Sequence, residues 1–167
     1  CLAEDGGFVA ADAELAAAWP IEAATVDALL AAGGQTGVPA LAREELRLPP
    51  FYLVGDPDFV RDRARQLGSE IALSIVTPAQ AAEIFPRALP IVPLQIPVTA
   101  APGKPDESSA PAAIASIRRA VSDVLAGQAA GIVTNPIAKN VLYRSGFPEP
   151  GHTEFLAKLV EEATGKA

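Results

Sequence analysis

Short apolar, strand-like runs alternate with segments that begin like helices, and this alternation limits the fold more than any other feature. Residues 51–54 form one such run, and Gly55-Asp56-Pro57 follows it. The aspartate there is suited to cap a helix and the proline to occupy its first turn. The arrangement recurs at 71–76, which Thr77-Pro78 follows. Strands that alternate with helices favour an α/β fold with a mainly parallel sheet.

Two further runs, 91–98 and 130–133, are expected to complete the sheet. Pro93 and Pro97 predict that the first of them is irregular or lies at an edge, because proline cannot donate a hydrogen bond to a neighbouring strand. Capping residues and terminal glycines predict the main helices. Their expected ranges are 57–67, a short helix from Pro78, 112–126, Thr134-Asn135-Pro136 to Gly146, and His152-Thr153 to Gly165.

The first 48 residues differ from the rest because alanine dominates them. Such runs are typical of packing helices without chemistry. We therefore expect an Ala-rich helical segment over 1–48 and an α/β portion over 49–167. The chain has 167 residues, begins with Cys1 and contains no methionine. Its length suits one domain, and we expect it to be a portion of a longer protein.

Charge and composition exclude several classes of protein. The net charge of −7 argues against a surface that neutralises nucleic-acid phosphates. No apolar run approaches the roughly 20 residues of a membrane helix, and no signal-peptide pattern is visible, so we expect a cytoplasmic location. A single cysteine and a single histidine exclude a disulfide framework, a Cys-rich zinc site and a histidine cluster within this chain.

Ligands of open parallel sheets gather beyond the carboxyl ends of the strands. That rule selects Gly55-Asp56, residues 99–106 and Thr134-Asn135. Asp56 could face a ligand, but helix capping explains it fully. Lys104 could meet a phosphate as a point charge, or it could be an ordinary surface lysine.

Two helix starts are candidates for binding an anion. The free N–H groups of a helix that follows Thr134 and Asn135 would favour an anion, and Lys139, one turn further, could point toward it. Helix capping by Thr134 or Asn135, with Lys139 exposed to solvent, explains this pattern equally well. At the last helix, His152 and Thr153 could bind a polar substrate through imidazole and hydroxyl. Alternatively, one of them caps the helix and the histidine is structural or exposed.

Four segments occur in a characteristic order and spacing: LPPFYLVGDP at 48–57, PGKPD at 102–106, VTNPIAK at 133–139 and PGHTEFL at 150–156. Together they resemble the 4-hydroxythreonine-4-phosphate dehydrogenase (PdxA) family over about residues 48–167. The resemblance implies an α/β/α fold related to isocitrate and isopropylmalate dehydrogenases. It also implies a homodimer with the active site near the subunit interface.

The resemblance also implies site residues. His152 and Thr153 match the substrate-contacting pair of the family's Gly-His-Thr-Glu-Phe segment. Thr134, Pro136 and Lys139 match a segment that lines the same pocket. The glycine-rich opening of the family is missing from 1–48. The family's metal-binding histidines and phosphate-binding residues follow the last segment, so no metal ligand is assigned in this chain.

The implied activity is an NAD(P)-dependent, metal-assisted oxidation of 4-phosphohydroxythreonine, followed by decarboxylation, in pyridoxal 5'-phosphate biosynthesis. The metal would be a divalent ion such as Zn, Mg or Co. We expect this chain to carry part of the substrate site and to be inactive alone. The alternatives are an inactive module that binds phosphate esters, a dehydrogenase for a related acid such as phosphothreonate, and an interaction unit built on the Ala-rich helices.

Overall fold

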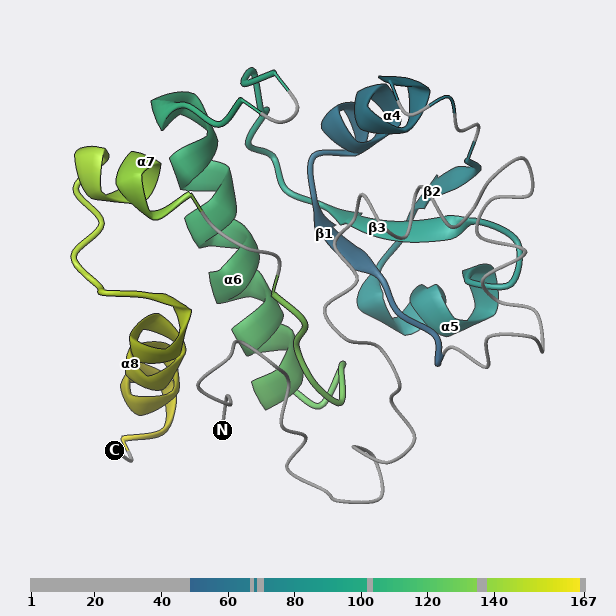
Figure 1. Ribbon diagram of the computed structural model, residues 1–167. Helices are drawn as coiled ribbons and strands as arrows, with labels where there is room; N and C mark the ends of the chain where they lie inside the picture. Colours follow the sequence, from purple (N-terminus) through teal and green to yellow (C-terminus); the bar gives the residue numbers. More distant parts are fainter. Residues whose placement is uncertain (1–48, 67, 69–70, 102–103, 135–137, 166–167) are drawn as a thin grey trace.

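A computed structural model describes residues 49–66, 68, 71–101, 104–134 and 138–165 (Figure 1). The expected helical segment over 1–48 lies outside these residues. Strands and helices alternate through the first part of the described chain, which is an α/β fold. The elements are β1 (Leu53–Gly55), α4 (Pro57–Gln66), β2 (Leu73–Ile75), η2 (Pro78–Gln80), α5 (Ala81–Ile84), β3 (Leu89–Pro93), η3 (Glu107–Ser109), α6 (Ala110–Leu125), α7 (Lys139–Arg144) and α8 (His152–Thr164).

The sheet that the structure describes has three parallel strands in the order β1-β3-β2. Leu53 of β1 lies opposite Ile91 of β3, and Leu73 of β2 lies opposite Leu89. Parallel neighbours need crossover connections, and helices α4 and α5 provide them. The mainly parallel sheet predicted from the alternating pattern is therefore confirmed.

Strand β3 is central, so the prediction of an edge strand is wrong. The N–H groups of successive residues point to opposite neighbouring strands. Leu89 donates to Ala72 on the β2 side at 2.8 Å, and Leu94 donates to Gly55 on the β1 side at 2.9 Å. By this alternation Pro90 faces β1 before that strand begins, and Pro93 faces β2 after it has ended. Both prolines therefore occupy positions that need no ladder hydrogen bond.

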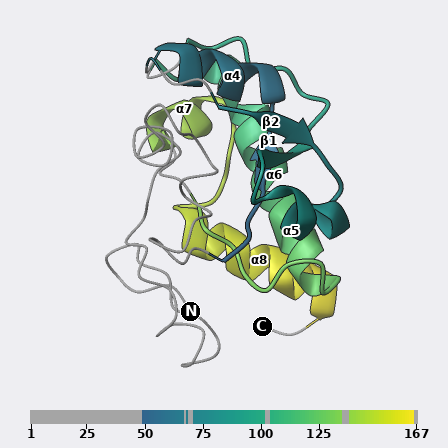
Figure 2. The ribbon, with the colours of Figure 1, turned by 90° about the vertical axis from the view of Figure 1, so that its right-hand side faces the viewer.

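Helices cover both faces of the sheet (Figures 1 and 2). On one face, Val60 and Ala64 of α4 pack against the side chain of Ile91, which is 0% exposed. On the other face, Val92 packs against Ala81 of α5, and α6 also contacts β1. Burial of an aliphatic side chain such as Ile91 contributes roughly 1.5–3 kcal/mol.

A buried carboxylate joins α6 to the first strand. Asp123 is 4% exposed. Its Oδ2 accepts a hydrogen bond from the Tyr52 hydroxyl at 3.0 Å. Its Oδ1 pairs with Nε of Arg119 at 2.8 Å. Because a buried charge is costly unless it is paired, these two contacts are what allow Asp123 to occupy a core position.

Helix α6 lies between the sheet and the helices α7 and α8 (Figure 1). A second core forms where α6, α7 and α8 meet. Left-handed glycines, Gly127 (φ 71°) and Gly165 (φ 67°), follow α6 and α8, as the sequence predicts for helix ends. Within the described ranges, no helix is both long enough and apolar enough to cross a bilayer. The members of this core are Ala110, Ile117, Val121, Val141, Leu142, Phe147, Phe155 and Leu159.

The strand expected over 130–133 is absent, because residues 129–134 are irregular and join no sheet. Ile132 packs against the core between α6, α7 and α8, whereas Val133 is 49% exposed. Contact with that helical core, away from the sheet, explains why this apolar run does not extend the sheet. Thr134 therefore does not follow a strand.

Candidate functional site

Helix α8 begins at His152, as predicted, but its N-cap is Gly151 and no side chain caps it. The expectation that His152 or Thr153 acts as the cap is therefore wrong. The first intrahelical bond runs from the Phe155 N–H to the Gly151 carbonyl at 3.2 Å. The Phe155 ring meets Phe147 edge to face, with ring centroids 4.9 Å apart. The start of α8 is thus anchored in the helical core.

The two candidate substrate residues of α8 have different surroundings. His152 is half-buried, and its Nε2 is shielded from solvent. Thr153 is exposed. A neutral imidazole offers one donor and one acceptor, and a threonine hydroxyl offers both. The exposed Thr153 hydroxyl is open to a substrate oxygen, whereas the Nε2 atom of His152 is not open to one in this structure. The substrate-binding role of the pair stays a prediction.

Helix α7 begins at Lys139, later than the sequence predicts. Its N-cap is Ala138, without a side-chain bond, so Thr134 does not cap it. Lys139 is consequently the first residue of the helix rather than one turn inside it. Thr134 is half-buried in the preceding irregular segment. Asn135 and Pro136 lie outside the described residues.

Lys139 nevertheless reaches the start of α8. A Cβ atom at Gly151 would lie 3.4 Å from Nζ of Lys139 and 3.2 Å from Oε2 of Glu154. Gly151 has φ −175°, an extended conformation open to any residue, and the two neighbouring atoms are the ends of flexible side chains. The structure thus brings Lys139 next to the residue that precedes His152. Whether Lys139 contacts substrate stays a prediction.

The connection between α7 and α8 is held at two further points. The Tyr143 hydroxyl donates a hydrogen bond to the Pro150 carbonyl at 2.8 Å. Nζ of Lys158 lies 2.7 Å from Oε1 of Glu149. Glu149 raises the pKa of Lys158 through that hydrogen bond and its charge. Both contacts fix residues that directly precede the predicted substrate pair.

The candidates at the sheet edge have structural partners. Asp56 accepts a hydrogen bond from the Asp58 N–H at 2.9 Å through Oδ1 and from the Val98 N–H at 2.8 Å through Oδ2. Helix capping is therefore confirmed for Asp56. Lys104 is exposed, and no distance in the described residues joins it to α7 or α8. A role of Lys104 in binding stays a prediction.

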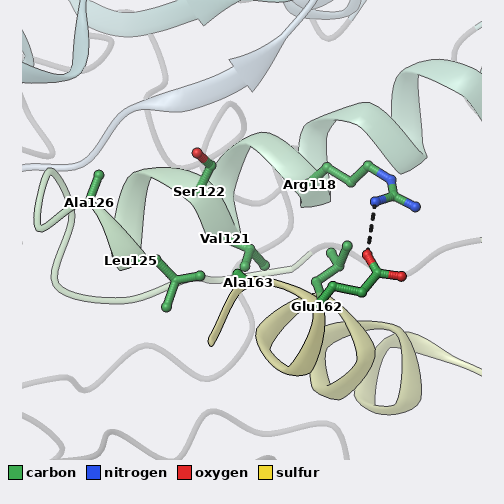
Figure 3. Close-up of a pocket in the computed structure, with 8 residues that line it drawn as sticks. Arg118, Val121, Ser122, Leu125, Ala126, Glu162 and Ala163 are labelled. Atoms are coloured by element: carbon green, nitrogen blue, oxygen red, sulfur yellow. Dashed lines mark ion pairs between the residues drawn. The ribbon is translucent and has the colours of Figure 1, made fainter. Parts of the chain in front are cut away.

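An open groove of about 530 Å³ lies between α6 and α8 (Figure 3). Val121 and Leu125 on α6 and Ala163 on α8 line it, and an ion pair between Arg118 and Glu162, 3.7 Å apart, crosses its rim. A smaller hollow of about 160 Å³ lies beside Phe147. None of the sequence-predicted site residues lines either space. Besides its apolar residues, the groove is lined by the Ser122 hydroxyl and by the Glu162 carboxylate, which is paired with Arg118.

The described residues contain no group of three or more His, Cys, Asp or Glu side chains that could hold a metal. The part of the chain that the structure describes therefore does not fit a metal centre. Sequence reasoning also missed three residues that organise the site and the fold: Tyr143, Lys158 and Asp123. A signal existed for Tyr143, because residues four apart on a helix share a face and Lys139 is four residues earlier. Asp123 could have been noticed as a charge on the apolar face of its helix.

Comparison with known proteins identifies relatives over this same region. A family model described as pyridoxal phosphate biosynthetic protein PdxA matches residues 47–165. The chain is 55% identical over 127 residues to the 4-hydroxythreonine-4-phosphate dehydrogenase of Bradyrhizobium diazoefficiens, which covers 71% of this chain and 37% of that protein. It is 52% identical over 115 residues to the Xanthobacter autotrophicus enzyme of the same name, with 69% and 33% covered.

A more distant relative of the same name, from Caulobacter vibrioides, is 38% identical over 116 residues, with 70% of this chain and 34% of that protein covered. The chain thus spans about a third of the length of the curated relatives it matches. No solved structure matches it.

Proposed function

The chain belongs to the PdxA family of pyridoxal phosphate biosynthetic proteins, and on that premise we propose that it is part of an enzyme that oxidises 4-hydroxythreonine 4-phosphate. The observation that carries this proposal is the family match over 47–165, together with relatives above 50% identity named for that dehydrogenase activity. NAD or NADP would accept the hydride, and decarboxylation of the oxidised product would follow.

We assign the substrate-binding role in this chain to His152 and Thr153, with Lys139, Thr134 and Asn135 as further contacts. The approach of the Lys139 ammonium to Gly151 supports this assignment, because it places a cation at a helix start. The Glu154 carboxylate lies at the same place, so a bound phosphate would take over from it as the partner of this cation. A phosphate ester carries the charge that such a place would attract. Cytoplasmic location and pairing with a second copy of the enzyme also stay proposals.

Oxidation of a secondary alcohol leaves developing negative charge on the oxygen, which a cation or a preorganised donor must stabilise. A divalent metal would supply that stabilisation when bound. The residues described here do not form its ligand set, and we place that set in the part of the relatives' length that this chain does not cover. What this chain contributes is orientation: a half-buried imidazole, an exposed hydroxyl and an ammonium at one helix start.

The test is an assay of the full-length gene product with 4-hydroxythreonine 4-phosphate, NAD or NADP and a divalent metal. We expect reduction of the nucleotide, with a loss of at least about tenfold in kcat/KM for His152→Ala or Thr153→Ala, equivalent to one lost charge-assisted contact. The matched control is Ser116→Ala, because that hydroxyl lies within α6 and bonds only the Ala113 carbonyl. No reduction with any metal tested would count against the proposal.

A second candidate is a module that binds phosphate esters without oxidising them. The limited coverage of the relatives, about a third of their length, favours this reading for the chain taken alone. Calorimetric titration of the 167-residue chain with the same phosphate ester distinguishes the two. Heat of binding by this chain, with no turnover by the full-length gene product on adding nucleotide and metal, supports the module, and turnover by the full-length product supports the enzyme. A related phosphorylated hydroxy acid, such as phosphothreonate, serves as the competing ligand.

A further inference from the structure

Side chains from the flanking helices hold the residues before His152. Lys158 of α8 pairs with Glu149 at 2.7 Å. The Tyr143 hydroxyl of α7 bonds the Pro150 carbonyl at 2.8 Å. Lys139 of α7 and Glu154 of α8 lie beside Gly151, because a Cβ atom added to that glycine would be 3.4 Å from Nζ of Lys139 and 3.2 Å from Oε2 of Glu154.

These contacts come from the two helices that the connection joins. Lys139 and Tyr143 are four residues apart, so they lie on one face of α7. Lys158 lies on α8 itself, beyond the connection. The residues that precede His152 are therefore held from both sides, and the first turn of α8 starts from a fixed backbone.

We propose that Tyr143 and Lys158, together with Lys139, form a clamp on residues 149–151 that positions His152 and Thr153 for substrate. Tyr143 and Lys158 are positioning residues in this assignment, because they act through the backbone of the connection. The consequence for substrate binding rests on the proposed function, whereas the clamp itself can be measured without any ligand.

The first intrahelical bond of α8, from the Phe155 N–H to the Gly151 carbonyl, reports on the clamp directly. Loss of a clamp contact lets Gly151 move, and this bond opens more often. The bond from the Gly165 N–H to the Glu161 carbonyl, 2.8 Å long at the other end of α8, is the internal reference. Amide hydrogen exchange measured by NMR resolves the two sites in one experiment.

The chain offers a matched control, because it contains only two tyrosines. Tyr143→Phe removes the hydroxyl that bonds Pro150, and Tyr52→Phe removes the hydroxyl that bonds Asp123 at 3.0 Å. Each variant loses one hydroxyl and one hydrogen bond of similar length. Only the first lies at the clamp.

In the 167-residue chain, we expect Tyr143→Phe to raise the exchange rate of the Phe155 amide roughly two- to tenfold, the effect of one lost hydrogen bond. The Gly165 amide should stay unchanged. Lys158→Met should act in the same direction, and Tyr52→Phe should leave the ratio of the two rates unaltered. Equal ratios in the Tyr143→Phe, Lys158→Met and wild-type chains would overturn the clamp.

A second readout concerns the site. Tyr143→Phe should weaken binding of 4-hydroxythreonine 4-phosphate relative to Tyr52→Phe in the same calorimetric titration. If exchange responds and no chain binds this ligand, the clamp stands and the assignment of a substrate site to His152 and Thr153 in this chain fails, whereas the proposed activity is tested separately by the assay of the full-length product. If the ligand binds equally to Tyr143→Phe and Tyr52→Phe, the clamp does not position the substrate pair.

Discussion

Ile75 and Ile91 are register partners on neighbouring parallel strands, yet Ile91 is 0% exposed and Ile75 is 65% exposed. The two side chains share a face of the sheet, because paired positions of parallel strands point the same way. The difference follows from the strand order: β3 is central and lies under α4, whereas β2 is at an edge.

This pair gives a direct test of where the core of the sheet lies. We expect Ile91→Ala to lower the free energy of unfolding by about 2–5 kcal/mol, since it removes buried methylene groups and leaves a cavity. Ile75→Ala should change it by no more than about 0.5 kcal/mol. Urea denaturation of both variants measures the difference. Similar losses for the two would contradict the observed strand order.

Asp56 ties the end of β1 to the segment after β3, because each of its oxygens accepts a backbone hydrogen bond. Asp56→Asn leaves one oxygen for two N–H donors, so we expect a loss of about 1–2 kcal/mol in the free energy of unfolding. The control is Asp62→Asn, an exposed carboxylate paired with Arg65 at 2.8 Å. Its loss should stay below about 1 kcal/mol. Equal losses would mean that Asp56 bonds only one of its partners.

The Tyr52 hydroxyl should lose its proton at a higher pH than an ordinary tyrosine. Burial, with the hydrogen bond to Asp123, raises the pKa of Tyr52 from its ordinary value of 10.0 to about 12. In Tyr143→Phe, Tyr52 is the remaining tyrosine, and its ionisation can be followed by ultraviolet absorbance. We expect a midpoint well above 10 in the folded chain and near 10 in urea. A midpoint near 10 in both conditions would show that the contact with Asp123 is not present in solution.

The same raised pKa makes stability depend on pH. The folded chain keeps the Tyr52 proton to higher pH than the unfolded chain does. The stabilising contribution is therefore fully present below about pH 10 and is lost as the pH rises from 10 toward 12. The free energy of unfolding, measured by urea denaturation across this pH range, should fall more steeply for the wild-type chain than for Tyr52→Phe. An equal decrease in the free energy of unfolding with pH for the two chains would contradict this link between Tyr52 ionisation and stability.

Most helix ends and the parallel sheet could be predicted from local sequence patterns. The start of α4 follows from Asp56-Pro57, and the ends of α6 and α8 follow from glycines in the left-handed conformation. The start of α8 was predicted from His152-Thr153 at the right position, but the cap is Gly151. Such signals act within one turn of chain, so one sequence is enough to read them. The parallel sheet follows from the alternation of strands and helices.

The wrong predictions, a strand over 130–133 and an edge position for the strand that contains Pro93, concern features that depend on tertiary contacts. Residues 130–133 have strand-like composition, but Ile132 contacts the helical core instead of a strand. Pro93 suggested an edge, but a central strand tolerates proline where its neighbour has already ended. Neither outcome can be read from the residues themselves, because each depends on what lies beside them in space.

The candidate site could be predicted only in part. The resemblance over 150–156 selected His152 and Thr153. Tyr143 was missed, although it lies four residues after Lys139 and therefore on the same face of α7. The Tyr143 hydroxyl reaches the Pro150 carbonyl seven residues away, and Lys158 reaches Glu149 nine residues away. Both partners lie in the connection before α8, and the sequence pattern does not predict the course of that connection.

The most direct test of the central claim uses the single histidine of the chain as a probe. The 167-residue chain is titrated with 4-hydroxythreonine 4-phosphate while the imidazole proton signals of His152 are followed by NMR. We predict a saturable shift of these signals that is at least about tenfold weaker in apparent affinity for Thr153→Ala. His152 signals that stay fixed while the ligand binds elsewhere, or that shift identically in Thr153→Ala, would contradict a substrate site at the start of α8.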